Sequence, residues 1–176
     1  EIVVNSAGCG SHMKEYGRLL EADPVWRERA AEFARRVVDF SEYVHRPENR
    51  TQLSAALSLK QDSTVAYDDP CHLCHGQNIR EQPRDLIGEL PGLRTVELSR
   101  PELCCGSAGI HSILRPQESQ RQLDEKLEDL AASGADTLVT ANPGCQMQWQ
   151  AGLTQQSSKV EVLHIAELLE RSLDPK

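Results

Sequence analysis

Four cysteines in three segments of the chain have the chemistry of metal ligands. Cys104 and Cys105 are adjacent in the sequence, and because neighbouring side chains diverge, the pair does not suit a single apolar core. A backbone that wraps around a multinuclear metal centre would let both thiols reach it, and the glycines after the pair permit the positive φ angles that this needs. Cys71 precedes the pair and Cys145 follows it at a similar distance. We therefore predict an iron–sulfur site with these four cysteines as its ligands.

The ligand types leave the identity of the metal open. Four soft thiolates suit an iron–sulfur cluster or a zinc ion. Around iron, backbone N–H groups of Gly-rich turns and helix N-termini would oppose the negative charge of the thiolates. A zinc ion would only join the loops together, as structural zinc sites do. Zinc is therefore the alternative cofactor, and a zinc-stapled structural module without electron transfer is the alternative function.

The segment around Cys71 also matches a second pattern. Cys71, Cys74 and His75 form a C-x-x-C-H motif, which is typical of covalent haem attachment. A c-type cytochrome is therefore a third possible function, but it would leave Cys104, Cys105 and Cys145 unexplained. With an iron–sulfur site, Cys74 is an extra thiol. His72 and His75 would then donate hydrogen bonds near the sulfur atoms, bind a substrate or quinone, or serve local packing.

The composition narrows the class of protein. The chain has 176 residues and a net charge of −8, which argues against nucleic acid and anionic membrane surfaces as main partners. No apolar run has the length of a membrane span. Six cysteines without a secretory signal indicate metal ligands or redox groups rather than a disulfide framework. Because the sequence begins with Glu1 and not with Met, we expect an N-terminal part to be missing.

Expected strands alternate with expected helices along the chain. Short β-branched runs predict strands at 2–4, 64–67, 95–98, 137–140 and 160–162. Periodicity and capping residues predict helices at 23–38, 41–45, 47–59, 78–90, 117–133 and 165–172. In the first helix, Asp23 is expected at the N-cap and Trp26, Phe33 and Val37 on the buried face. The alternation predicts an α/β fold with a mostly parallel sheet and crossover helices.

The cysteine segments follow three of these strands. Ligand sites of parallel sheets gather at the carboxyl ends of the strands, so the three segments are expected to meet at one edge of the sheet. Asp68 and Asp69 come just before the first cysteine segment. They are expected to cap that loop rather than to take part in acid–base chemistry.

Two distant segments of the chain are alike. Residues 3–9 align with 139–145, and residues 38–43 align with 163–168. A strand, a Gly-Cys turn and a closing helix therefore occur twice, but only the second copy follows further cysteine segments. We interpret the chain as two pseudo-repeated modules. Residues 1–60 would be the tail of a truncated first module with connecting helices, and residues 61–176 a complete second module. Cys9 would then belong to a site whose other ligands are missing, and His12 would be either a further ligand of that site or a surface histidine.

Three motifs resemble those of the cysteine-rich CCG family. They are Asp69-Pro70-Cys71-His72-Leu73, Leu103-Cys104-Cys105-Gly106-Ser107-Ala108-Gly109 and Ala141-Asn142-Pro143-Gly144-Cys145. The family includes one of the subunits of heterodisulfide reductase and iron–sulfur subunits of respiratory dehydrogenases, and the resemblance is greatest to the glycolate oxidase type. It implies a [4Fe–4S] cluster held by the four cysteines predicted above. Gln148 stands where the heterodisulfide reductase motif has a further cysteine, so a five-cysteine cluster is not expected.

The resemblance also implies a function and partners. A flavin-containing dehydrogenase subunit would oxidise glycolate or another 2-hydroxy acid, and this chain would pass the electrons towards quinone or another membrane electron acceptor. The flavin and the substrate site are expected on that other subunit, and no catalytic residue is expected here. The implied location is cytoplasmic, with peripheral attachment to the inner face of the cell membrane as an option.

Overall fold

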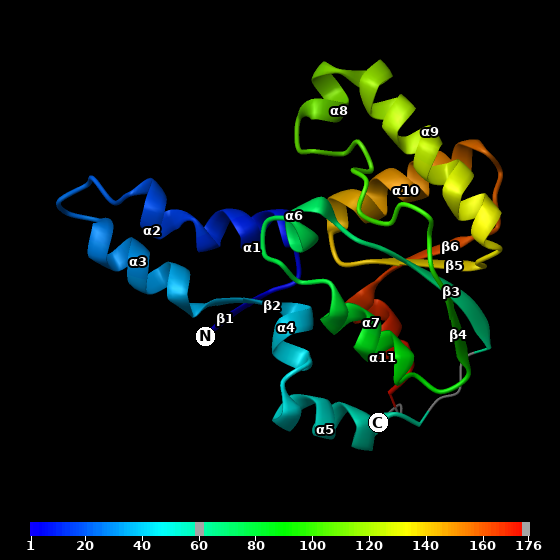
Figure 1. Cartoon of the computed structure of the whole chain (residues 1–176), viewed down its shortest axis with the longest axis horizontal. Coiled ribbons are helices and arrows are strands. Elements are labelled where there is room, and N and C mark those ends of the chain that lie inside the picture. The colour runs from blue at the N-terminus through cyan, green and yellow to red at the C-terminus, as the bar shows by residue number, and fades with distance from the viewer. Residues whose placement is uncertain (59–61, 174–176) are drawn as a thin grey trace.

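The core of the molecule is a parallel sheet of four strands. The computed structural model describes residues 1–58 and 62–173. The strands β3, β4, β5 and β6 span Ser63–Asp68, Leu93–Val96, Thr137–Thr140 and Glu161–His164. Their order across the sheet is β4-β3-β5-β6, and every neighbouring pair is parallel. Crossover helices connect the strands (Figure 1), which confirms the predicted α/β class.

Helices cover both faces of this sheet (Figure 1). Helices α7 and α11 lie on one face, and α9 and α10 lie on the other. Their bounds are Glu81–Gly88, Ile165–Arg171, Pro116–Ser133 and Pro143–Gln155, respectively. Because side chains alternate along a strand, Val65 and Tyr67 pack in the cluster with α7 and α11, whereas Ala66 packs in the cluster with α9 and α10. The sheet is therefore the middle of three layers.

The elements around the sheet agree with the predicted positions to different degrees. The helix predicted at 117–133 is confirmed as α9, which has Pro116 in its first turn and ends at Gly134 with a φ of 70°. The helix predicted at 78–90 is shorter and begins at Glu81. The strand predicted at 95–98 lies two residues earlier, because β4 pairs with β3 from Leu93 to Val96.

Helix α10 was missing from the predicted elements, since only a turn was expected around Cys145. The helix has buried residues at Cys145, Trp149, Gly152 and Leu153, which is the spacing of one helical face. A Cβ atom on Gly152 would lie 2.8 Å from Leu123 and 2.9 Å from Leu127. Glycine at this position thus lets α10 pack closely against α9, although it weakened the helical signal in the sequence.

The N-terminal part forms a small parallel sheet with short helices around it. Strands β1 (Ile2–Val4) and β2 (Val37–Asp39) pair in parallel. The helices of this part are α1 (Ala7–Lys14), α2 (Tyr16–Leu19), α3 (Arg27–Arg36), α4 (Phe40–Val44) and α5 (Pro47–Ala56). The single-turn helices α6 (Cys71–Cys74) and α8 (His111–Leu114) lie in the loops after β3 and β4. The helix predicted at 47–59 corresponds to α5, and its predicted last residue, 59, lies outside the described residues.

The helix predicted at 23–38 was wrong at both ends. Helix α3 begins at Arg27, and Oδ1 of Asp23 accepts hydrogen bonds from the backbone of Val25 and Trp26 in the preceding turn. Residues 37–39 are a strand, because tertiary pairing with β1 overrides the helical pattern of the sequence. Trp26 is 48% exposed, so its predicted place in the core is also wrong.

The two sheets share a local geometry. Val4 pairs with Asp39 at the end of β1 and β2, and Thr140 pairs with His164 at the end of β5 and β6. Asp39 and His164 both begin the next helix with a capping box, closed by the glutamate three residues later. These are the segments that align in the sequence. The predicted boundary between two modules, at residues 60 and 61, lies outside the described residues.

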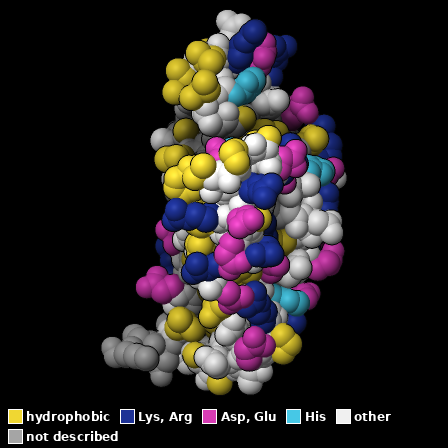
Figure 2. Space-filling model, turned by 90° about the vertical axis from the view of Figure 1, so that its left-hand side faces the viewer, with side chains coloured by type: hydrophobic (Ala, Val, Ile, Leu, Met, Phe, Trp, Pro, Cys, Tyr) yellow, Lys and Arg dark blue, Asp and Glu magenta, His cyan; other side chains and the backbone are white. Residues whose placement is uncertain are grey.

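The surface carries charges of both signs despite the net charge of −8. Figure 2 shows acidic, basic and hydrophobic side chains interspersed on the side of the N-terminal helices. Leu19, Val25 and Trp26 are among the exposed hydrophobic residues. None of the helices in the described residues combines the length and the apolar character that a membrane-spanning helix needs.

Candidate metal centre

Three cysteine segments follow the carboxyl ends of β3, β4 and β5. Cys71 is the first residue of α6, Cys104 and Cys105 lie in the loop after β4, and Cys145 lies in the first turn of α10. Cys105 and Cys145 are buried, at 3% and 5% exposure, whereas Cys71 and Cys104 are partly exposed. The four thiols thus lie at the boundary between the protein interior and solvent.

The four thiols contact one another in series. Thiol–thiol interactions link Cys71 with Cys104, Cys104 with Cys105, and Cys105 with Cys145. They lower the pKa of Cys104, because the thiols of Cys105 and Cys71 stabilise its thiolate. The same interactions, together with burial, raise the pKa of Cys71 and Cys105. The pKa of Cys104 is therefore shifted towards the thiolate form, in the opposite direction to the pKa values of Cys71 and Cys105.

Backbone groups complete the surroundings of the Cys104 sulfur. The N–H of Gly106 donates to Sγ of Cys104 at 3.4 Å. Gly106 has a φ of +86°, and a Cβ atom there would lie 2.5 Å from the carbonyl oxygen of Ser119. The φ of Gly109 is +61°. Both glycines therefore have the positive φ that was predicted for a loop wrapping around the site.

Among residues 1–58 and 62–173, no group of three or more His, Cys, Asp or Glu side chains has the arrangement that would hold a single metal ion. Four soft sulfur donors with a backbone N–H directed at one of them nevertheless have the chemistry that an iron–sulfur cluster requires.

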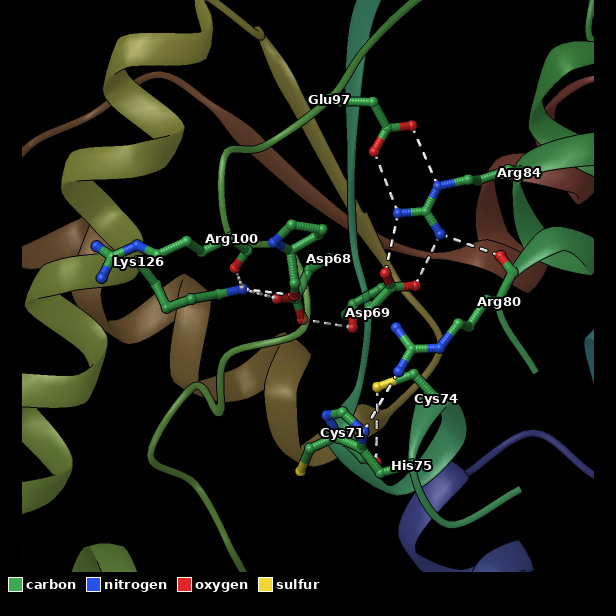
Figure 3. Close-up of polar contacts among 12 residues, drawn as sticks. Asp68, Asp69, Cys71, Cys74, His75, Arg80, Arg84, Glu97, Arg100 and Lys126 are labelled. Atoms are coloured by element: carbon green, nitrogen blue, oxygen red, sulfur yellow. Dashed lines mark hydrogen bonds and ion pairs between the residues drawn. The ribbon is translucent and has the colours of Figure 1, made fainter. Parts of the chain in front are cut away.

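The remaining cysteines lie apart from this series. Cys74 is buried, and its thiol donates to the backbone oxygen of Cys71 at 3.7 Å. Figure 3 shows the Cys74 sulfur directed towards Arg80 and the Cys71 sulfur directed elsewhere. Burial raises the pKa of Cys74, whereas the charge of Arg80 lowers it. Cys9 is exposed on α1.

The histidines of the cysteine segments have local partners. Nδ1 of His72 lies 3.4 Å from Sγ of Cys71, as one of the predicted roles requires. Nδ1 of His75 lies 3.3 Å from a guanidinium nitrogen of Arg80. The ring of His12 makes an edge contact with that of Tyr16, with centroids 5.4 Å apart.

Asp68 and Asp69 hold the loops of the site through ion pairs on opposite faces of β3 (Figure 3). Oδ1 of Asp68 lies 2.8 Å from Nζ of Lys126 on α9, and both side chains are 1% exposed. This contact is an ion pair rather than an aligned hydrogen bond, and Nζ of Lys126 also donates to the backbone oxygens of Arg100 and Pro101, at 3.2 and 2.7 Å. One buried ammonium group therefore ties β3 to the loop that carries the adjacent cysteines.

On the other face, Asp69 accepts two hydrogen bonds from Arg84, each 2.9 Å long. Arg84 also donates twice to Glu97 at 3.1 Å, and the N–H of Asp69 donates to the oxygen of Pro101 at 3.2 Å. The prediction that these aspartates merely cap a loop was therefore incomplete.

A signal for Lys126 existed, since it lies on the helix face formed by Leu123, Leu127 and Leu130, where a lone lysine requires a buried partner.

Comparisons with known proteins identify the family of the chain. A model of the CCG family, described as a cysteine-rich domain, matches residues 65–150. Lactate utilization protein A of Exiguobacterium sp. is 32% identical over 168 residues, which cover 96% of this chain and 67% of that protein. The chain belongs to the CCG cysteine-rich family.

Two further relatives also align with 96% of this chain. Lactate utilization protein A of Bacillus subtilis is 30% identical over 170 residues, covering 96% of this chain and 70% of that protein. The probable glycolate oxidase iron-sulfur subunit of Bacillus subtilis is 38% identical over 170 residues, covering 96% of this chain but 38% of that protein. This CCG chain therefore spans well under half the length of the glycolate oxidase relative and about two thirds of the others.

Proposed function

We propose that this chain belongs to an iron–sulfur electron-transfer subunit of a flavin-dependent 2-hydroxy acid dehydrogenase. The observation that carries the proposal is the series of contacts from Cys71 through Cys104 and Cys105 to Cys145. Two relatives are named for glycolate oxidase and for lactate utilization, and both acids carry a 2-hydroxyl group. Glycolate is the first substrate to test, because the relative named for it has the higher identity.

The four cysteines would hold the cluster, which supplies one-electron transfer when it is bound. Cysteine binds metal as a thiolate, and the lowered pKa of Cys104 favours that form, whereas the raised pKa of Cys71 and Cys105 opposes it. The buried Cys105 and Cys145 keep water from the inner side of the site. The partly exposed Cys71 and Cys104 lie on the side that a partner subunit can approach.

A [4Fe–4S] cluster is the cofactor that we propose, with zinc as the alternative. A structural zinc ion needs four ligands about one point, with zinc–sulfur distances of about 2.3 Å. The thiols of the four cysteines contact one another in series. The relative named as an iron-sulfur subunit supports a cluster over a zinc-stapled assembly module.

The proposal includes partners, a location and a domain organisation. Electrons would arrive from a flavin-containing subunit that also holds the substrate, and would leave towards quinone or another membrane acceptor. The protein would be cytoplasmic or attached peripherally to the inner face of the cell membrane. Residues 1–60 would be the tail of a first CCG module and residues 61–176 a complete second one. Val4 pairs with Asp39 in the same way as Thr140, at the aligned position, pairs with His164, and this equivalence supports that division.

Metal analysis of the full-length protein, prepared without oxygen, tests the proposal. We expect iron and acid-labile sulfide in equal amounts, with an EPR signal after reduction. Zinc without sulfide would establish the assembly module instead, and haem that stays attached after denaturation would establish a cytochrome. With the purified complex, quinone reduction driven by glycolate and by lactate then identifies the donor.

A further inference from the structure

We propose that Asn142 is a positioning residue for the metal centre, linking the sulfur of Cys145 to the N-terminus of α1. The inference rests on the proposed role of Cys145 as a ligand. Nδ2 of Asn142 donates to Sγ of Cys145 at 3.4 Å. Its Oδ1 accepts from the N–H of Gly8 at 3.3 Å and from the hydroxyl of Ser6 at 3.4 Å. One amide group thus connects a cysteine of the site to a helix 134 residues away in the sequence.

The orientation of this amide follows from its partners. The backbone N–H of Gly8 can only donate, so the side-chain atom that it faces must be the oxygen of Asn142. The nitrogen of the amide is then the atom directed at the sulfur of Cys145. The hydrogen bond to sulfur is therefore fixed by the contact with α1.

An ordinary capping role does not explain Asn142. It occupies the N-cap of α10, where an asparagine normally accepts a hydrogen bond from the first turn of its own helix. Here its side chain makes no such bond. Helix α1 has Ser6 at its N-cap, which also makes no side-chain capping bond. The oxygen of Asn142 instead satisfies one of the free N–H groups that every helix has in its first turn.

The surrounding glycines leave room for this amide. A Cβ atom on Gly144 would lie 3.3 Å from Nδ2 of Asn142 and 3.1 Å from Oγ of Ser107 in the loop after the adjacent cysteines. Both distances are shorter than ordinary carbon contacts. A side chain at position 144 would therefore press on the amide from the side of the site.

A donor directed at a ligand sulfur affects the electrons of the centre. Reduction adds negative charge, and the positive end of an N–H dipole stabilises the reduced form more than the oxidised form. Hydrogen bonds to sulfur are among the factors that set cluster potentials, and the partners of metal ligands also support metal retention. Asn142 is therefore expected to raise the reduction potential of the centre and to slow the loss of its metal.

The test compares Asn142→Ala and Asn142→Asp with wild type in the full-length protein. Both variants should lower the reduction potential in an EPR-monitored titration, and both should weaken metal retention against a chelator by roughly 10–100-fold. Asn142→Asp keeps the acceptor for Gly8 and lacks the donor for Cys145, so it tests the sulfur contact even where Asn142→Ala folds poorly. Asn142→Ala carries no added charge and separates the lost donor from a new carboxylate.

Gln146→Ala is the matched control. Gln146 is the residue after Cys145, and its amide donates to Glu167 at 2.7 Å and not to sulfur. A potential and a metal retention in Asn142→Ala that equal those of Gln146→Ala would overturn the inference. Zinc without sulfide in the wild type would overturn the proposed function but not this inference. The effect of Asn142 on metal retention can still be measured by chelator competition with the zinc-bound protein. Faster hydrogen exchange of the Gly8 amide in Asn142→Ala would support the link to α1, and unchanged exchange would contradict it.

Discussion

Lys126 and Asp68 form an ion pair of 2.8 Å in which each side chain is 1% exposed. The pair joins the long helix α9 to the end of β3, next to the cysteine segments. Burial raises the pKa of Asp68, and the charge of Lys126 opposes that rise. The carboxylate therefore depends on the ammonium group for its charged form.

Replacing Lys126 with methionine should be strongly destabilising. Asp68 would be left charged and unpaired in the interior, which costs about 3–5 kcal/mol in comparable buried pairs. Chemical unfolding of the metal-free protein measures this loss. Because the folded pKa of Asp68 lies above its unfolded value, protonation restores part of the stability, and the loss should be smaller at pH 5 than at pH 8.

The double variant Asp68→Asn with Lys126→Met is the control for that experiment. It removes both charges, so it should be more stable than Lys126→Met alone and show no such pH dependence. Equal stability of the single and double variants would contradict the role given to the unpaired carboxylate.

Gly106→Ala should distort the loop of the adjacent cysteines. The φ of +86° costs a non-glycine residue roughly 1–3 kcal/mol, and the new Cβ atom would also meet the Ser119 oxygen at 2.5 Å. Thermal unfolding and metal content should both fall. Gly134→Ala separates the two causes, because Gly134 has a φ of +70° with no atom within 4 Å of the new Cβ. If Gly134→Ala were equally destabilising, the contact with Ser119 would be unimportant.

His164 should make stability depend on pH. It is 5% exposed, and burial lowers its pKa. Its Nδ1 accepts the N–H of Ala166 and so caps α11. As the pH falls, the unfolded state binds the proton first, because its histidine pKa is about 6.5. The contribution of His164 to the free energy of unfolding should therefore be complete above that pH and be lost as the pH falls below it.

Unfolding of His164→Asn between pH 5 and 8 checks this expectation. Asparagine keeps a capping oxygen but does not titrate, so the curve should be flatter than that of wild type. His12→Asn changes an exposed histidine and should retain the wild-type curve. If the stability of His164→Asn depended on pH as strongly as that of wild type, other groups would be responsible for the pH dependence.

Substitution of single cysteines should separate the ligands from the extra thiol. Cys104→Ser and Cys145→Ser should lose the metal centre and any electron transfer to quinone, since each removes one sulfur from the series. Cys74→Ser should keep both, because Cys74 bonds to the backbone of Cys71 and lies outside that series. Iron and sulfide content of the three variants provides the measurement, and metal loss in Cys74→Ser would mean that the proposed ligand set is wrong.

Local signals in the sequence were sufficient for much of the fold. β-branched runs predicted β3, β5 and β6, and Pro116 with Gly134 predicted the ends of α9, because these signals depend on neighbouring residues only. Strand β2 was missed because Val37 and Val38 continue a helical pattern and become a strand only through pairing with Ile2 and Val3. Helix α10 was missed because its glycines serve packing and weaken the local helical preference.

The chemistry of the site was determined by the sequence itself. Cys71, Cys104, Cys105 and Cys145 supply soft thiol donors, and each follows a predicted strand, so their types and approximate placement needed no further information. Only the tertiary structure decided which groups surround them. Lys126 meets Asp68, and Asn142 meets Gly8 from 134 residues away. The helix pattern indicates that Lys126 is buried, but neither partner can be read from neighbouring residues, because such contacts form only when the layers pack together.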